Sequence, residues 1–428
     1  MGSVKARLSL MMFLEFFIWG AWLPLIFGYL PSLGYSSGQQ SWILNAFAIA
    51  SLTAMFFSTQ FADRKFAAQR FLSFSHLVGG VAILSLFWVR DFHTFLRCML
   101  VHSLFYVPTI SITNSIAFAS LKDAQQDFGR VRLWGTIGWI AASWPFVFVL
   151  ADWDKVPALS EVGFTSWLGA ALGTAKTGEA LMAATRYTFV AAGVASLLLA
   201  LLALRLPHTP PKPWSAGGNS LAWLDAMKLL RHPFVLVLFI VTFFDAAVHQ
   251  GYFVFANDYL QHVGIPANWV MPVMSIGQLA EIGTMAFLGG VLAKLGWRTT
   301  MTLGVLGHAL RFGTFALLPE PVPAVLVNVL HGICYAFFFA TVYIFVDEHF
   351  PKDARSSAQG LFNFLILGAG PFVANIVWLD LKAYYTVDGT VDYSKLMLVP
   401  SGVAFCAALF LFLFFRPPQR VAGASAKA

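Results

Sequence analysis

Apolar runs of about twenty residues recur along the whole chain, and they limit its possible folds more than any other feature. A bilayer is spanned by a helix of ~20 mostly apolar residues. The runs do not alternate apolar and polar side chains, as the ~10-residue strands of a membrane barrel would. They predict an all-α integral membrane protein with twelve spans, approximately at 8–29, 41–61, 70–89, 93–117, 131–151, 186–205, 233–256, 267–293, 298–317, 321–346, 356–379 and 395–415.

Composition excludes the other broad classes. Of the 428 residues, 58% are hydrophobic and 11% charged, whereas soluble domains average about 45–50% apolar and ~25% charged residues. Cys98, Cys334 and Cys406 lie inside apolar runs, with neither a disulfide framework nor metal-ligand spacing, so we expect them to be core residues. No metal or cofactor is predicted. The basic N-terminus followed by a long apolar run, without a small-residue cleavage site, predicts a first span rather than a cleaved signal peptide.

The positions of lysine and arginine predict the orientation. If both termini are cytoplasmic, the cytoplasmic pieces hold 19 of the 27 cations, at 5, 7, 64, 65, 70, 122, 130, 132, 205, 212, 228, 231, 294, 298, 352, 355, 416, 420 and 427. The predicted outer loops at 30–40, 261–266 and 318–322 hold none. Cytoplasmic loops of membrane proteins are enriched in these residues. The net charge of +7 is therefore attributed to topology and not to nucleic-acid binding.

The runs divide into two sets of six. We expect an N-terminal bundle at 1–205, a Pro-rich basic cytoplasmic linker at 206–232, and a C-terminal bundle with a short cytoplasmic tail at 233–428. Basic turns follow the second and eighth runs, FADRKFAAQR (61–70) and LAKLGWRTT (292–300), as in a duplicated six-helix unit. Two such halves around a midplane site are the architecture of major facilitator transporters.

Two connections between the runs, the linker and the segment 152–185, also have patterns that bear on their structure. Trp223, Met227 and Leu230 have helical spacing in the linker, which suits either a short surface helix or a solvated tether. The segment 152–185 lacks a long apolar run and is expected to form an outer-face loop or lid.

Ionisable residues inside the runs are candidates for function, since a charge in the hydrocarbon costs at least ~2.5–3.5 kcal/mol on insertion scales. Structural alternatives exist: Glu15 and Arg311 can form a buried pair, and any histidine can simply bond a neighbouring helix. The candidates are Glu15, His76, His102, Arg132, Asp245, His249, Glu281, His308, Arg311 and His331.

Two clusters stand out in the seventh and eighth runs. Gln278 and Glu281 lie three residues apart and share a helix face, which Thr284 continues. Asp245 lies four residues before His249, and Gln250 directly follows His249. A carboxylate and an amide together offer donors and acceptors for sugar hydroxyls or base edges. A desolvated glutamate also favours its protonated form, so it can load and release a proton. The structural alternative is a hydrogen-bond clamp between helices.

The fifth run opens with GRVRLWGTIGWI. Arg132, Thr136 and Trp139 have helical spacing, so a cation, a hydroxyl and an indole can hold a flat polar solute. Gly135 and Gly138 lie where another helix can approach closely. The structural alternative is an interfacial arginine followed by packing residues.

These residues also carry a resemblance. The sequence resembles the bacterial nucleoside:proton symporter family of the major facilitator superfamily over most of its length. The matching pieces are FLEFFIWGAWLPLIFGYL (13–30), FYVPTISITNSIAF (105–118), RLWGTIGW (132–139), MSIGQLAE (274–281), ALRFGTFAL (309–317) and ARSSAQGLFN (354–363).

The resemblance implies solute-binding positions and a membrane. By motif, the implied solute contacts are Arg132, Thr136, Trp139, Gln250, Gln278, Glu281 and Tyr335. Where the family has an asparagine one turn after the glutamine, this chain has Phe253, and where it has a tenth-span aspartate, this chain has Ala336. The implied location is the bacterial cytoplasmic (inner) membrane.

The expected function is import of nucleosides by proton symport through alternating access, with Glu281, Asp245 and Glu15 as candidates for proton coupling. The expected partners are a nucleoside, a proton and the lipid bilayer, with no nucleic acid, and the chain is expected to be a monomer. Because Ala336 replaces the acid, two alternatives stay open: a carrier of another polar solute, such as a sugar or nucleobase, and transport without proton coupling. Enzyme signatures such as a Gly-rich phosphate loop or Gly-x-Ser-x-Gly are absent from the sequence, so an enzyme is not expected, and neither is a receptor with a soluble signalling domain.

Overall fold

The computed structural model describes residues 4–57, 66–211, 227–350 and 355–417, and most of them are helical. The first half contains α1 (Val4–Ser32), α2 (Ser37–Phe57), α4 (Ala68–Ser85), α5 (Phe92–Ser120), α6 (Ala124–Ser143), α7 (Phe146–Val149), α8 (Leu159–Gly173), α9 (Gly178–Thr185) and α10 (Tyr187–Ala203). The second half contains α12 (Pro233–His262), α13 (Val270–Leu317), α14 (Pro321–Leu326), α15 (Leu330–Cys334), α16 (Thr341–His349), α17 (Arg355–Asn363), α18 (Gly370–Tyr384) and α19 (Tyr393–Phe414). Short 3-10 turns occur at Trp153–Lys155, Leu229–Arg231, Ala267–Trp269 and Val327–Val329, and strands β1 (Thr386–Val387) and β2 (Thr390–Val391) form a hairpin.

The twelve predicted runs are helical over most of their described length. Among the described residues, eight helical stretches are long and apolar enough to cross a membrane, and they contain nine of the runs, because 267–317 holds two. The runs at 41–61 and 70–89 lie mainly in α2 and α4, and the run at 131–151 covers the second half of α6 and all of α7. The prediction of a multi-pass helical membrane protein is confirmed.

The eighth and ninth runs form one continuous element, α13, with a sharp bend. Gly296 at the bend has φ 71° and ψ 171°, a conformation that side chains other than hydrogen rarely permit. This bend falls between the predicted ends of the two runs, at 293 and 298.

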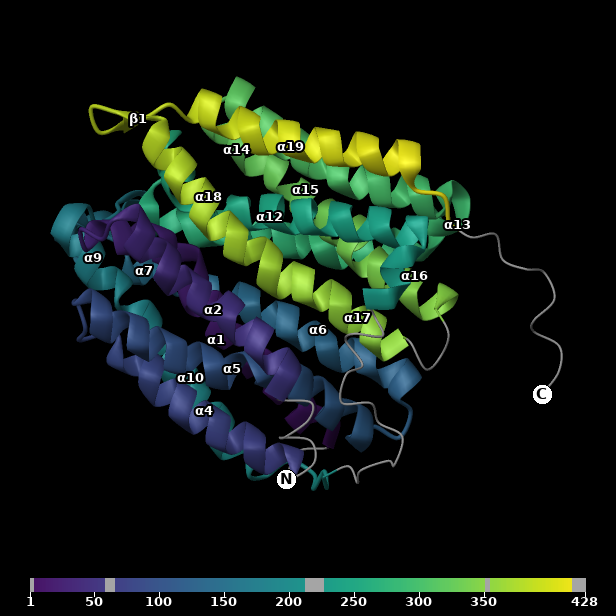
Figure 1. Cartoon of the computed structure of the whole chain (residues 1–428). Helices are drawn as coiled ribbons and strands as arrows, with labels where there is room; N and C mark the ends of the chain where they lie inside the picture. Colours follow the sequence, from purple (N-terminus) through teal and green to yellow (C-terminus); the bar gives the residue numbers. More distant parts are fainter. Residues whose placement is uncertain (1–3, 58–65, 212–226, 351–354, 418–428) are drawn as a thin grey trace.

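The helices form two bundles that meet along a central interface (Figure 1). In the N-terminal bundle, α1 packs against α6 and α10, while α4 and α5 pack together. In the C-terminal bundle, α13 packs against α15 and α19, and α12 packs against α18 and α19. The bundles meet mainly where α2 contacts α18 and where α1 and α6 contact α12 and α13. The β1–β2 hairpin, α7 and α9 lie at one end of the bundles, and α16 and α17 lie toward the other (Figure 1).

Glycines bring α1 and α6 into close contact. A Cβ atom on Gly138 would lie 2.1 Å from the backbone oxygen of Phe13, and one on Gly20 would lie 2.9 Å from the backbone oxygen of Trp139. The two backbones therefore touch, as small residues allow in membrane helices. The predicted close approach at Gly135 and Gly138 is confirmed, with α1 as the partner.

We expect Gly138→Ala to destabilise the protein by about 1–3 kcal/mol, because its methyl group must push two backbones apart. Thermal unfolding in detergent measures the effect. Gly129→Ala is the matched control on the same helix, because a Cβ there meets no atom within 4 Å. Equal melting temperatures for wild type and Gly138→Ala would contradict the close packing.

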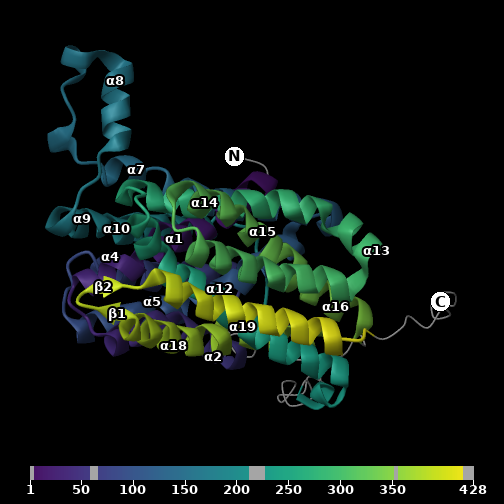
Figure 2. The same ribbon diagram turned by 90° about the horizontal axis from the view of Figure 1, so that it is seen from above.

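The segment 152–185 is not the simple loop or lid that we expected. It contains α8 and α9, and α8 stands away from the bundles (Figure 2). A bridge between Ala151 and Ala175 closes its base, and the Trp167 ring packs between those of Trp153 and Phe164. The sequence signal was missed because Gly163, at φ 75°, interrupts the helical pattern.

Two π-helical segments lie in the C-terminal bundle. They are Tyr335–Ala340, between α15 and α16, and Phe364–Ala369, between α17 and α18. Single π-turns inside helices often occur at functional sites.

The remaining sequence expectations have mixed outcomes. The three cysteines are free, and of these only Cys334 is a buried core residue. Cys98 is half-buried. Cys406 lies on the exposed face of α19, because an apolar side chain of a membrane helix can face lipid as well as the core. Part of the FADRKFAAQR turn and residue Trp223 lie outside the described residues, so the expectations for the turn and the linker stay predictions.

Candidate functional site

A cavity of about 280 Å³ lies between the two bundles. Its walls come from α1, α2, α5 and α6 of the N-terminal bundle and from α12, α13, α15, α16, α18 and both π-segments of the C-terminal bundle. Its volume is near the lower end of the ~300–1,000 Å³ range of small-molecule sites. The lining is mostly apolar, with a few polar groups, as is typical of such sites.

The structure brings all seven predicted solute-binding residues to this one cavity. Three come from α6, one from α12, two from α13 and one from the first π-segment: Arg132, Thr136, Trp139, Gln250, Gln278, Glu281 and Tyr335. Their contact with a solute stays a prediction. Thr284 was expected to continue the face of Glu281, but it is not among the lining residues, and its hydroxyl donates to the Ala280 carbonyl.

Arg132 is held by packing in the N-terminal bundle. Its guanidinium carbon lies 4.0 Å from the centre of the Phe16 ring, in a cation–π contact. Across the cavity it interacts electrostatically with Glu281 of the C-terminal bundle. A solute that bridges a cation and a carboxyl group would therefore contact both bundles at once.

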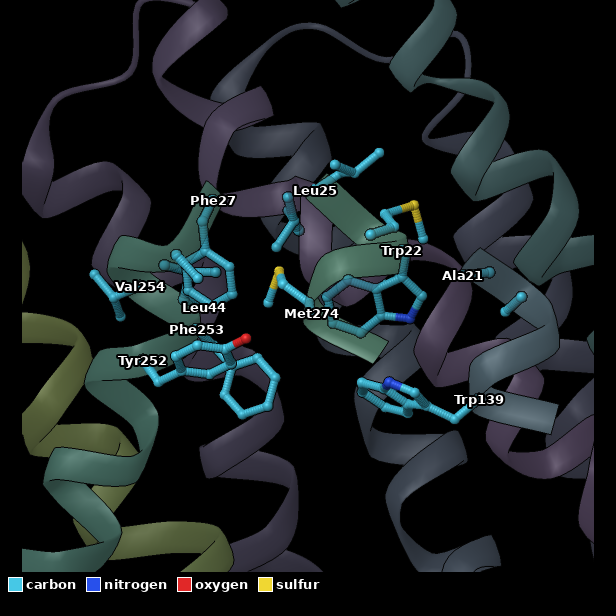
Figure 3. Packing of buried hydrophobic residues seen from close by; sticks show 14 of the residues in the cluster. Ala21, Trp22, Leu25, Phe27, Leu44, Trp139, Tyr252, Phe253, Val254 and Met274 are labelled. Atoms are coloured by element: carbon cyan, nitrogen blue, oxygen red, sulfur yellow. The ribbon is translucent and has the colours of Figure 1, made fainter. Parts of the chain in front are cut away.

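Aromatic rings line the cavity from both bundles. Trp19 packs edge-on against Trp139, with ring centres 5.3 Å apart, and stacks on Phe47 at 4.8 Å. In Figure 3 the indoles of Trp22 and Trp139 lie on one side and the Phe253 ring, from α12, lies on the other. These faces suit a flat solute that stacks.

Four polar atoms on the cavity-lining side chains have no hydrogen-bond partner within the described residues. They are Nε1 of Trp19, Nε1 of Trp22, Nδ1 of His249 and Oε1 of Gln278, all buried. Buried polar groups are nearly always hydrogen-bonded. Two indole donors, an amide acceptor and an imidazole nitrogen are thus available for a polar solute.

A chain of amides connects the bundles beside the cavity. Gln250 Nε2 donates to Asn375 Oδ1 at 2.9 Å, and Asn375 Nδ2 donates to Asn45 Oδ1 at 3.0 Å. Ser41 of α2 also donates to the Asn375 carbonyl at 3.0 Å. Asn45 and Asn375 were not predicted, because neither is ionisable; the sequence signal that marks them is an amide inside an apolar run.

Glu15 does not line the cavity and does not pair with Arg311, so that predicted pair is wrong. Its Oε2 lies 2.9 Å from His76 Nε2, and its Oε1 accepts a hydrogen bond from Thr109 at 2.7 Å. The carboxyl group of Glu15 finds its hydrogen-bond partners within its own bundle, because His76 and Thr109 face it there. Arg311 lies in the other bundle. His102 bonds the Gly79 carbonyl at 3.0 Å, which fits the structural alternative for this histidine.

Asp245 also lies outside the cavity lining, in a polar cluster behind it. His308 lies between Asp245 and Arg311, and Arg311 in turn contacts His331. His249 and His331 line the cavity and join the cluster to it. Among the residues that the structure describes, no group of His, Cys, Asp and Glu is placed to hold a metal ion.

Comparison with known proteins identifies the family. The family model described as "Nucleoside H+ symporter" matches residues 1–162 and 149–420. The chain is 32% identical to the putative nucleoside transporter YegT of Escherichia coli (strain K12), covering 97% of this chain and 94% of that protein. It is 28% identical to the xanthosine permease of the same organism, with 96% of each covered.

Solved structures agree on the fold. The crystal structure of the nucleoside transporter NupG matches with a TM-score of 0.80 at 24% identity, covering 97% of this chain and 100% of that one. The chain therefore has the major facilitator fold, with two six-helix bundles, and is a transporter and not an enzyme. The matches over nearly its whole length show that it belongs to the nucleoside H+ symporter family.

Proposed function

We propose that this multi-pass membrane protein imports nucleosides by proton symport and that the cavity between its bundles is the nucleoside site. The observation that carries the assignment is the convergence of Arg132, Gln278 and Glu281, from both bundles, on one cavity with an aromatic wall. A nucleoside has a flat base for the rings and hydroxyls for the charged and amide groups.

Each lining residue takes a role that suits its chemistry. Arg132 and Gln278 bind polar groups of the solute, with Thr136 and Gln250 as further hydrogen-bonding contacts. Trp139 and Tyr335 stack on the base. Glu281 binds the coupled proton, so that its charge state changes the affinity for the solute.

Alternating access follows from the two-bundle architecture. The bundles rock about the central site and expose it to one side of the membrane and then to the other. The bundles correspond to residues 1–205 and 233–428, and residues 206–232 form the cytoplasmic linker. Both termini face the cytoplasm of a bacterial cell, the protein lies in the inner membrane, and a monomer suffices because the cavity is built within one chain. The distribution of Lys and Arg supports this orientation.

The test is uptake of labelled uridine and adenosine into proteoliposomes, with and without an inward proton gradient. We expect accumulation above equilibrium that collapses when a protonophore is added. Competition by unlabelled sugars and nucleobases measures the alternative solutes. Uptake that a sugar or nucleobase blocks better than nucleosides would overturn the nucleoside assignment, and equilibration without accumulation would overturn proton coupling.

A further inference from the structure

Each bundle contains a buried pair of an acid and a histidine on equivalent helices. Glu15 and His76 come from the first and third runs of the N-terminal bundle, and Asp245 and His308 come from the first and third runs of the C-terminal bundle. The halves of a major facilitator protein are parallel repeats related by an axis along the membrane normal. The two pairs therefore occupy corresponding places, and their differences are informative.

The pair in the N-terminal bundle is fully bonded. Glu15 contacts His76 at 2.9 Å and Thr109 at 2.7 Å, and its backbone carbonyl accepts from Tyr106 at 2.6 Å. The other ring nitrogen of His76 lies 3.0 Å from Ser196 Oγ. Such a network holds four helices together and leaves neither side-chain oxygen of Glu15 unpartnered.

The acid of the pair in the C-terminal bundle lacks hydrogen bonds. Asp245 is completely buried, and neither of its carboxyl oxygens has a hydrogen-bond partner in the described part of the chain. His308 Nε2 lies 3.7 Å from Oδ1, which is too long for a hydrogen bond. An unbonded carboxylate in the membrane interior costs several kcal/mol, so the group either takes up a proton or closes on a donor.

Arg311 determines which donor is available. Its guanidinium is always charged and only donates, so the contacts to Nδ1 of His308 at 3.0 Å and of His331 at 2.8 Å make both nitrogens acceptors. The hydrogen of neutral His308 then lies on Nε2, which faces Asp245. A charged Asp245 can accept this hydrogen by closing the 3.7 Å gap, whereas a protonated Asp245 has no need to.

The other groups around Asp245 keep the two imidazoles neutral. Arg311 lies 4.1 Å from the centre of the Tyr252 ring and beside His308 and His331, so a second cation on either ring would be repelled by it. Cys334, on α15, and Tyr252 are further titratable side chains that interact electrostatically with Arg311. Unlike His308 and His331, Asp245 can change its charge without breaking a hydrogen bond to Arg311.

A route leads from the cavity to Asp245. His249 lines the cavity, one helical turn from Asp245 on α12, and its ring centre is 4.9 Å from His331 and 5.4 Å from His308. Its Nδ1 has no hydrogen-bond partner within the described residues and Arg311 does not bond it. His249 can therefore pass a proton between the cavity and the cluster.

We propose that Asp245 is a second proton-binding site of the transport cycle, connected to the solute cavity through His249 and paired with His308. The proton enters from the outer side with the solute, resides on the carboxyl group while the cavity is occupied, and leaves to the cytoplasm. This site rests on the proposed nucleoside symport and adds one proton to the one on Glu281.

The test is the number of protons moved per nucleoside. In proteoliposomes with the membrane potential clamped at zero, the logarithm of the accumulation ratio is measured against the pH gradient, and its slope is that number. We expect a slope of about two for the wild type and about one for Asp245→Asn, that is, roughly 100-fold against roughly 10-fold accumulation per pH unit. Nucleoside exchange at equal pH should continue in the variant.

Two further variants control the result. Asp245→Glu keeps a titratable group and should restore a slope near the wild-type value. Glu15→Gln changes the equivalent acid of the other bundle and should leave the slope unchanged, because that acid is already bonded. A lower slope in Glu15→Gln with an unchanged slope in Asp245→Asn would overturn the assignment in favour of the N-terminal pair.

Three further outcomes would overturn the proposal. A wild-type slope of about one overturns the second proton, even if Asp245→Asn does not fold. An unchanged slope in a folded Asp245→Asn does the same. Absence of nucleoside exchange by the wild type contradicts the proposed function itself, and the proton site that rests on it.

Discussion

Proteoliposomes that contain Glu281→Gln will accumulate about tenfold less nucleoside than wild type at an inward gradient of one pH unit, because one coupled proton is worth ~1.4 kcal/mol per unit. Glutamine keeps the size and polarity of the side chain in the cavity but cannot gain or lose a proton. Exchange of labelled for unlabelled nucleoside at equal pH should therefore persist. The measurement is accumulation and exchange on the same preparation.

The control is Glu320→Gln, which changes an exposed glutamate in the loop before α14 and should accumulate nucleoside as wild type does. Two results would refute the role of Glu281. One is undiminished accumulation in Glu281→Gln, and the other is loss of exchange together with accumulation, which would make Glu281 a binding residue only.

Arg132→Ala will weaken nucleoside binding by roughly 10- to 100-fold, since a hydrogen bond to a charged group contributes about 1.5–3 kcal/mol. The guanidinium is fixed over Phe16 and stands across the cavity from Glu281, so its removal takes away the charged donor of the N-terminal bundle. Binding to protein in detergent, followed by tryptophan fluorescence or calorimetry, measures the change.

Arg132→Lys separates charge from shape. Lysine keeps the charge but lacks the planar fork and stacks less well on a ring, so it should recover only part of the affinity. Wild-type affinity in Arg132→Ala would show that the guanidinium makes no contact with the solute that contributes to binding.

The spans could be predicted from the sequence because membrane insertion depends on summed hydropathy over about twenty residues, which is a local property. The bend at Gly296 could also be predicted from the sequence, since basic and small residues interrupt the apolar pattern there. The helices at 159–185 were not predictable in this way. Their apolar pattern is shorter than a span, and Gly163 interrupts it.

The candidate site was predictable in part. Residues such as Gln278 and Glu281 share a helix face, and spacing along one helix is enough to group them. The partners of Glu15 and Arg311 depend on which helices pack together, and the sequence alone left the wrong pair open. The link between Asn45 and Asn375 crosses 330 residues of sequence, which no local pattern contains.

The π-segments and the glycine contacts give the two walls of the cavity different mechanical properties. On α6, Arg132, Thr136 and Trp139 are fixed to a helix whose backbone touches α1 at Gly20 and Gly138, so these three groups keep their spacing while the bundles rock. The opposite wall includes Tyr335 and residues of the second π-segment, where the wider helical turn has hydrogen bonds that can rearrange. We therefore expect the wall on α6 to keep its shape when a solute binds, and the opposite wall to adjust to that solute.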